Sequence, residues 1–353
     1  MKTIQVNGIE IKTSFDFPII DDERYNFIVE SFFKKPSLDK VKYEMYNISN
    51  GSSNIKAITD YYYRDLMSEC TTYRSKFSIY DVMHDRTLVS LIDYVTQRRC
   101  KYFYANNSCD SADGVKEAFR QFFATGGNSL ARSVGQFPLD TVQYILDKYN
   151  VNNNYYDFSC GWGSRLAGAL SKGVNYYGTD PNYKLTEKLQ EYIKDYKSIV
   201  HQNTSKVNIY TQGSEFFIDE LRGKMGLCFS STPYYKVEDY KYGNQSCRKE
   251  SYKEWKDEYL RPTIENCYSY LVDDGFFIIN IKNYRNYKLE EDSCKIATDV
   301  GFHYYCTENL YLDKSYVRSN GIDGQSVSTN EPMFVFTKNK DVKLPGFQKI
   351  ELW

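Results

Sequence analysis

Histidine is scarce in this chain of 353 residues, which contains three of them. His84, His201 and His303 lie far apart in the sequence, and none has a partner at the spacing of metal ligands. The nine cysteines are irregularly spaced and form no C-x-x-C pair, which argues against a disulfide framework and against a zinc site. We therefore expect no metal, and reduced cysteines as in a cytoplasmic protein.

Long apolar runs are also missing. No stretch reaches the ~18 apolar residues of a membrane span, and the opening MKTIQVNGIEIKTSFDF lacks the apolar segment of a secretory signal. Neither charge is in excess, since Lys and Arg total 45 and Asp and Glu total 46. This balance does not indicate a nucleic-acid-binding protein, and it does not exclude one that carries a local basic groove.

Residues 1–135 show helical patterns and little strand alternation after the opening segment. DDERYNFIVESFFKK (21–35) has an acidic start, apolar residues at helical spacing and a basic end. A similar segment begins at Ser37, and another begins at Gly114 and closes with Gly126 and Gly127. We predict a mainly helical N-terminal domain over 1–135 that ends in the glycine-rich stretch 125–136.

From about residue 137, short apolar runs alternate with helical segments. The predicted strands are 154–158, 174–180, 206–212, 225–231, 275–281, 301–312 and 332–338. Helical segments separate all but the last two. This order predicts an α/β fold with a doubly wound, mostly parallel seven-stranded sheet and an antiparallel end strand.

A glycine-containing turn follows the first of these strands, in DFSCGWGS (157–164). Gly161 and Gly163 lack a Cβ and allow the backbone to approach a ligand closely. In an open parallel sheet, ligands bind beyond the carboxyl ends of the strands near the first crossover. A plain strand-to-helix turn explains the two glycines equally well when they are taken alone. Cys160 needs no thiol role here, and Trp162 is either a core anchor or a cover over the ligand.

Acidic residues follow the next two strands. Asp180, in GTDPN, comes roughly 20 residues after the glycines, which is the spacing of a carboxylate that accepts hydrogen bonds from ribose hydroxyls. A helix cap is the simpler alternative for a single Asp. In QGSEFF, the backbone of Ser214 or the side chain of Glu215 could reach an adenine amino group, although Glu215 also suits a first helical turn. The two spacings together favour a nucleoside site.

The fourth strand ends in SSTPYY (230–235), which places two tyrosines where a flat ring could stack on them. With this motif, the set resembles the S-adenosylmethionine-dependent amino methyltransferases that act on adenine N6 or cytosine N4 in DNA. DFSCGWGSRLAGAL is similar to the family's D-P-F-x-G-x-G turn, GTDPN to its acidic second-strand motif, and SSTPYY to its [DNS]-P-P-[YF] catalytic motif. The likeness extends over about 136–338 and is greatest to phage-encoded enzymes with a D-P-x-x-G-W-G turn.

The resemblance implies a Rossmann-like class I methyltransferase domain over 136–353, S-adenosylmethionine as cofactor, DNA as partner and a place in the host cytoplasm. GQFPLDTVQYIL (135–146) resembles the segment that closes over the methionine end of the cofactor. The residues that the resemblance assigns to cofactor binding are Phe137, Asp157, Ser159, Gly161, Gly163, Asp180, Ser214 and Glu215.

The implied catalytic residues are Ser231, Thr232, Pro233 and Tyr234. In the family, the first side chain of this motif and the next backbone carbonyl accept hydrogen bonds from the target amino group. Tyr234 would stack on the extruded base. Phe158 and Thr232 stand where the family has proline, and because Thr232 lacks the fixed φ of proline we expect a looser acceptor site.

Three functions are therefore open: a DNA amino methyltransferase, a catalytically degenerate binding protein that acts as scaffold or inhibitor, and a transferase acting on RNA, protein or a small amine. Basic residues mix with aromatic ones in 97–107, which suits a nucleic-acid groove or equally a helix end followed by a core strand. The loop 240–256 carries the basic residues Lys241, Arg248, Lys249 and Lys253 among others, and is either a substrate contact or a solvated loop. The motifs do not specify the target base, the recognition sequence or the oligomeric state.

Overall fold

The computed structural model describes residues 2–6, 8–103, 110–125, 130–310 and 331–342. Two compact units make up the chain. The first, here called the helical unit, comprises Met1–Ser37, Asp60–Gly135 and Val237–Lys241. The second, the sheet unit, comprises Leu38–Thr59, Gln136–Lys236 and Tyr242–Trp353.

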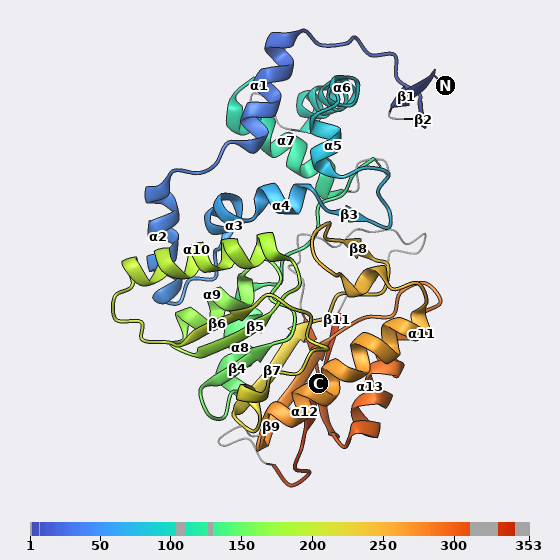
Figure 1. Cartoon of the computed structure of the whole chain (residues 1–353). Helices are drawn as coiled ribbons and strands as arrows, with labels where there is room; N and C mark the ends of the chain where they lie inside the picture. The colour runs from blue at the N-terminus through green and yellow to red at the C-terminus, as the bar shows by residue number, and fades with distance from the viewer. Residues whose placement is uncertain (1, 7, 104–109, 126–129, 311–330, 343–353) are drawn as a thin grey trace. The chain divides into compact units, whose positions relative to one another are not determined.

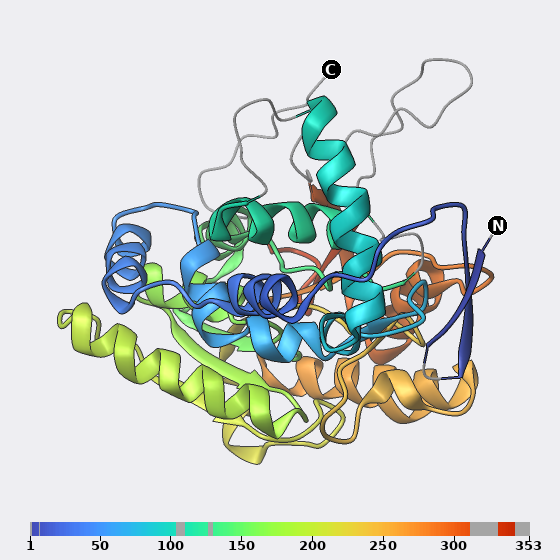
Figure 2. The same ribbon diagram turned by 90° about the horizontal axis from the view of Figure 1, so that it is seen from above.

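The helical unit opens with a hairpin of β1 (Lys2–Val6) and β2 (Ile9–Thr13). Its helices are α1 (Asp22–Phe33), α4 (Arg64–Ser68), α5 (Ile79–Met83), α6 (Arg86–Phe103) and α7 (Ala112–Ala124). Of these, α1, α6 and α7 contact one another (Figure 2) around a core that contains Phe32 and Phe123. Asp21 and Ser111 cap the first and last helix, as short polar side chains do at helix starts.

Two segments do not follow the predicted division into residues 1–135 and 136–353. Helix α2 (Leu38–Ser49) belongs to the sheet unit and contacts α9 (Ser164–Ser171) and α10 (Tyr183–Ile199). In the other direction, β8 (Glu238–Asp239) pairs with β3 (Thr71–Thr72) inside the helical unit. The apolar stripe of α2 predicts a helix, but a stripe of this kind fits any complementary surface, so the pattern does not identify the unit against which it packs. Helix α3 (Lys56–Tyr62) carries the chain from one unit to the other.

The sheet unit is built on seven strands: β4 (Asn154–Asp157), β5 (Asn175–Thr179), β6 (Val207–Tyr210), β7 (Met225–Ser231), β9 (Leu271–Asn280), β10 (His303–Leu310) and β11 (Glu331–Thr337). Their order is β10-β11-β9-β7-β4-β5-β6. Strand β11 runs antiparallel to both of its neighbours, and the other neighbouring pairs are parallel. The predicted doubly wound, mostly parallel sheet with an antiparallel strand at one end is confirmed.

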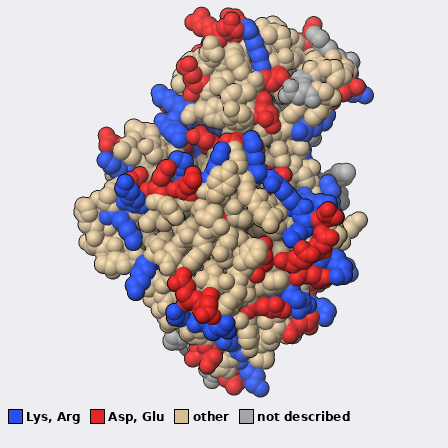
Figure 3. All heavy atoms as spheres, in the orientation of Figure 1, with Lys and Arg blue, Asp and Glu red and all other residues tan. Residues whose placement is uncertain are grey.

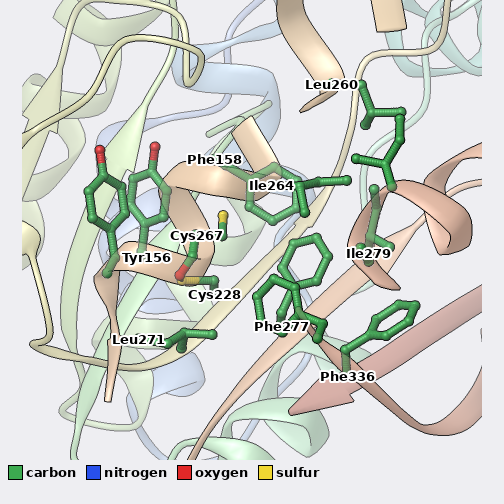
Figure 4. Packing of buried hydrophobic residues seen from close by; sticks show 14 of the residues in the cluster. Tyr156, Phe158, Cys228, Leu260, Ile264, Cys267, Leu271, Phe277, Ile279 and Phe336 are labelled. Atoms are coloured by element: carbon green, nitrogen blue, oxygen red, sulfur yellow. The ribbon is translucent and has the colours of Figure 1, made fainter. Parts of the chain in front are cut away.

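Helices cover both faces of this sheet (Figure 1). Neighbouring residues of a strand point to opposite sides, so one strand contributes side chains to the packing on both faces. Phe276 of β9 packs on Tyr149 of α8 (Leu139–Tyr149), with ring centres 5.1 Å apart. Phe277 instead joins a core cluster with Phe158 and Ile264 (Figure 4). That cluster is built on the helical run α11 (Tyr252–Trp255), η4 (Lys256–Leu260) and α12 (Arg261–Tyr270), and on α13 (Leu289–Val300).

Short 3-10 turns, η2 (Asp219–Leu221) and η3 (Ser246–Arg248), complete the sheet unit. Over the parts of the chain that the structure describes, no helix combines the length and apolar character needed to cross a membrane. The predicted helix end at Gly126 and Gly127, and the part of the basic segment 97–107 beyond residue 103, lie outside the described residues.

Candidate functional site

The glycine turn lies where β4 passes into α9, as the sequence predicts. Gly161 and Gly163 both have left-handed backbone, with φ of +56° and +77°, a conformation that residues with a Cβ rarely adopt. A Cβ on Gly161 would also stand 3.1 Å from the Nη2 atom of Arg165. The local backbone therefore favours glycine at both positions, and close packing against Arg165 adds to this at Gly161.

A buried ion pair holds the turn from inside. Asp157 has no exposed surface, and its Oδ2 accepts hydrogen bonds from Arg165 Nε (2.9 Å) and from the Tyr176 hydroxyl (2.8 Å). Its Oδ1 accepts from the backbone N–H of Ser159 (3.2 Å), whose carbonyl accepts from the same guanidinium. Burial by itself would lower the pKa of the Arg165 guanidinium, but the charge and hydrogen bond of Asp157, together with Tyr155 and Tyr176, raise this pKa above its usual value. Asp157 thus shapes the turn with protein partners on both oxygens.

Arg165 was not predicted from the sequence. Its only signal is a single cation at the start of a helix of small and apolar residues, SRLAGALS. A cation at a helix start is opposed by the helix dipole, so a specific acidic partner is needed to keep it there.

The segment before α8 lies over the glycine turn. Phe137 is half-buried, with its ring centre 5.5 Å from that of Phe229 and 5.6 Å from the guanidinium of Arg165. Gln136, which the sequence reasoning missed, donates from Nε2 to the carbonyl of Trp162 (2.8 Å) and accepts at Oε1 from Thr59 Oγ1 (2.7 Å). Trp162 itself is buried. Gln136, next to Phe137, is therefore tied to the turn by a direct hydrogen bond.

Asp180 follows β5 and faces the same turn. Its carboxylate accepts hydrogen bonds from the backbone N–H groups of Asn182 (2.9 Å) and Gly161. Desolvation raises the pKa of Asp180 to about 7, with the charge of Asp157 acting in the same direction and that of Arg165 against it. A carboxylate offers about four lone-pair positions. Two are used by protein donors, so acceptor capacity for a diol remains.

The two predicted residues of the loop after β6, Ser214 and Glu215, differ in their hydrogen bonding. Ser214 is buried, its Oγ lies 2.8 Å from Thr263 Oγ1, and its carbonyl accepts from Asn266 Nδ2 (2.8 Å). Glu215 is half-buried, and its Oε2 is a buried atom with no hydrogen-bond partner among the residues described. Burial raises the pKa of Glu215, while the charge of Lys249 opposes this. The unpaired acceptor of this loop is therefore Glu215.

The predicted catalytic motif begins at the last residue of β7. Ser230 donates from Oγ to the carbonyl of Ser159 (3.2 Å), which joins this strand end to the glycine turn. Ser231 is partly exposed, whereas Thr232 is buried with its Oγ1 2.8 Å from the hydroxyl of Tyr259. Pro233 and Tyr234 are half-buried, and Tyr234 packs against the core cluster. The structure thus brings Ser231 and the turn to one edge of the sheet.

Asn280 is a further residue at this edge that the sequence reasoning missed. It ends β9, is paired in register with Ser231, and has no exposed surface. Its Nδ2 donates to the carbonyl of Pro332 (3.1 Å), and its Oδ1 has no partner in the part of the chain described. The signal in the sequence is one amide within the apolar run GFFIINI.

The basic loop 240–256 is largely paired. Lys249 lies 2.7 Å from Glu258, Lys253 contacts Asp257, and Lys241 belongs to the helical unit. Arg248 is exposed. Within the described ranges, no group of three or more His, Cys, Asp or Glu side chains is placed to hold a metal ion.

Comparisons with known proteins identify structures rather than sequences. No family model matches the chain. No curated protein matches it either. Among solved structures, a TehB-like S-adenosylmethionine-dependent methyltransferase from Corynebacterium glutamicum is 15% identical over 64% of this chain and 97% of its own, with a TM-score of 0.37. Magnesium protoporphyrin IX methyltransferase from Synechocystis, with bound S-adenosylmethionine, is 14% identical over 71% and 96%, with a TM-score of 0.38.

A geranyl diphosphate methyltransferase in complex with S-adenosylmethionine is 10% identical over 57% of this chain and 86% of its own, with a TM-score of 0.40. At such low identities and TM-scores, the fold and the site are defined by the strand order and the local geometry of this chain alone. Numbered from β4 in chain order, the strands of the sheet run 3-2-1-4-5-7-6 from the β6 edge. The order reverses between β4 and β7, and the glycine turn and Ser231 follow these two strands. This is the switch point at which doubly wound sheets bind ligands.

Proposed function

We propose that the sheet unit is an S-adenosylmethionine-dependent methyltransferase that methylates an exocyclic amino group of a DNA base, adenine N6 or cytosine N4. The observation that carries the proposal is the hydrogen bond between Ser230 Oγ and the Ser159 carbonyl. It places the motif that resembles the family's methyl-acceptor site beside the motif that resembles its cofactor site. Two such motifs meeting at the switch point of the sheet support a two-substrate transfer site.

The residues at the edge of the sheet fit the proposed cofactor. Asp180 retains acceptor capacity for the ribose hydroxyls, and the unpartnered Oε2 of Glu215 suits a donor such as the adenine amino group. When bound, S-adenosylmethionine supplies a methyl group whose bond to a positive sulfur breaks as the bond to nitrogen forms, after which the nitrogen releases one proton.

The chain's own part in this reaction is to hold the acceptor nitrogen. The Ser231 hydroxyl and the Thr232 carbonyl would accept hydrogen bonds from the amino group, and Tyr234 would stack on the base. No covalent intermediate is required, so the rate depends mainly on orientation, which is worth up to about 7–11 kcal/mol.

The environment of Thr232 supports a working acceptor site over a degenerate one. The sequence predicts a looser loop because Thr232 replaces a proline. In the structure, the buried Thr232 is held by the hydrogen bond to Tyr259. This hydrogen bond restricts Thr232, as the ring of a proline would, although through a different interaction.

Charge distribution favours a second candidate, methyl transfer to a small amine. On the face shown in Figure 3, Asp and Glu side chains lie next to Lys and Arg side chains in each unit. The pairing of Lys249 with Glu258 and of Lys253 with Asp257 agrees with this. DNA remains the first candidate because the acceptor motif resembles that of enzymes acting on bases.

The test is transfer of labelled methyl groups from S-adenosylmethionine to adenine- or cytosine-containing DNA, with RNA and small amines as parallel acceptors. Tyr234→Ala should abolish transfer to a base and leave cofactor affinity unchanged, because the ring would hold the base. Tyr304→Ala, an exposed tyrosine on β10, is the control. Full activity of Tyr234→Ala would show that the acceptor site is elsewhere, and activity confined to small amines would establish the second candidate.

A further inference from the structure

The helical run from Tyr252 to Tyr270 contains one irregular turn. Pro262 cannot donate a backbone hydrogen bond, and its ring crowds the carbonyl four residues earlier. At this place η4 is π-helical, and the N–H of Arg261 donates to the carbonyl of Lys256, five residues back. Such turns insert an extra residue into a helix and often occur at functional sites. The turn ends next to Tyr259.

Three polar side chains form a stripe on this helical run, here called the polar stripe: Tyr259, Thr263 and Asn266. Their spacing of four and then three residues places them on one face. All are buried, with exposed fractions of 3%, 1% and 8%. Burying polar groups is costly unless they are hydrogen-bonded.

The bonds of the polar stripe all go to loops of the candidate site. Thr263 and Asn266 hold the side chain and the carbonyl of Ser214, beside Glu215. The hydroxyl of Tyr259 lies 2.8 Å from Thr232 Oγ1, one helical turn before the bond of Thr263 to Ser214. One helical run thus contacts both the loop that would bind the nucleoside and the loop that would bind the methyl acceptor.

We propose that Tyr259 is a positioning residue that fixes the Thr232 carbonyl relative to the nucleoside loop at Ser214–Glu215. The proposal rests on the methyltransferase function proposed above. It also accounts for the missing proline at 232, because the Tyr259 hydroxyl restrains the loop that a proline would otherwise stiffen. Tyr259 acts through Thr232 and touches neither substrate.

Loss of the Tyr259 hydroxyl should affect turnover more than cofactor binding. A misplacement of about 1 Å can cost roughly 100-fold in rate. Tyr259→Phe removes only the hydroxyl and keeps the ring in the core. We expect it to lower kcat about 10–100-fold while the Kd for S-adenosylmethionine changes less than about threefold.

The experiment measures kcat, KM and cofactor Kd for Tyr259→Phe, Thr232→Val and the double variant. Val matches the shape of Thr but lacks its hydroxyl, so both single variants break the same bond. If the bond is the cause, the double variant loses no more than either single one. Thr232→Ser, which keeps the hydroxyl, should restore most of the activity that Thr232→Val loses.

Tyr196→Phe is the matched control. Tyr196 is a fully buried tyrosine of α10 whose hydroxyl has no hydrogen-bond partner within the described residues. The Tyr196→Phe variant should keep the wild-type kcat. If wild type is active and Tyr259→Phe keeps kcat within twofold, or if the two losses simply add, the positioning role is wrong while the methyltransferase function stands. If wild type transfers methyl groups to no acceptor, both proposals fall together.

Discussion

Arg165 Nε lies 2.9 Å from Asp157 Oδ2, and both side chains are buried beneath the glycine turn. Removing one partner of such a pair leaves an uncompensated buried charge, which typically costs about 3–5 kcal/mol. We expect Arg165→Met to lower the free energy of unfolding by that amount. Trp162 and Trp255 are buried in the sheet unit, so tryptophan fluorescence in a urea titration reports on this unit.

Arg222→Met is the control for this prediction. Arg222 pairs with Asp219, but their side chains are 62% and 86% exposed. Exposed pairs contribute about 0–1 kcal/mol, so this variant should unfold almost as wild type does. Equal effects of the two substitutions would mean that the buried pair does not hold the turn.

A second prediction concerns Asp180 and pH. Its carboxylate would accept hydrogen bonds from ribose hydroxyls best when charged, and burial raises its pKa to about 7. Affinity for S-adenosylmethionine should therefore rise between pH 6 and pH 8. The neighbouring Arg165 has a raised pKa and keeps its charge over this range, and Cys160 is buried with a raised pKa. Calorimetric titration of wild type and Asp180→Asn measures this, and the variant should bind weakly with no such rise.

The same pKa shift has the opposite sign for stability. Because the pKa of folded Asp180 lies above its ordinary value of 3.8, the folded state holds its proton more tightly than the unfolded state does. The resulting stabilisation is complete below about pH 4 and is lost as the pH rises through about 7. Asp180→Asn should flatten this part of the stability profile. An unchanged profile in the variant would show that another group titrates.

A third prediction compares two glycines that have similar backbone. Gly243 has φ +78°, and a Cβ there would lie 1.9 Å from the carbonyl oxygen of Pro181, directly after Asp180. Gly223 has φ +64° and open space around it. Gly243→Ala should cost about 1–3 kcal/mol more stability than Gly223→Ala, as overpacking does. It should also weaken cofactor binding, which calorimetry measures, whereas Gly223→Ala should not. Equal behaviour of the two variants would contradict the close contact with Pro181.

Local patterns were sufficient to predict the sheet. The continuous apolar run of β7, MGLCFSS, is typical of a strand buried on both faces, and the predicted range 225–231 is the observed one. Helix α2 was predicted as a helix but assigned to the wrong unit. Its stripe of Val41, Met45 and Ile48 states that one face is buried without stating against what.

The candidate site, like the fold, could be predicted only in part. The glycine turn and the position of Asp180 could be predicted because both belong to short motifs at a fixed spacing. The partners of Asp157 and Thr232 could not, since Tyr176 and Tyr259 lie 19 and 27 residues away and are two of 35 tyrosines. A residue type that is common throughout a chain gives no local signal of which copy is placed at the site.

The last prediction tests whether DNA is the substrate through the loop 240–256. A cation that contacts a DNA phosphate releases a counterion, so the log of affinity falls with the log of salt concentration by about 0.9 for each contact. Arg248 is exposed, and Lys249 acts on Glu215 of the candidate site although it is paired with Glu258. We expect Arg248→Gln and Lys249→Gln each to reduce the salt slope by up to about 1. Lys188→Gln, which removes a partly exposed cation of α10 paired with Glu191, should leave the slope unchanged. Fluorescence anisotropy with a labelled duplex between 50 and 200 mM salt, roughly the range over which such slopes are resolved, is the measurement. Wild-type binding without salt dependence, or equal slopes for all three variants, would exclude this loop from DNA contact and favour a small amine as methyl acceptor.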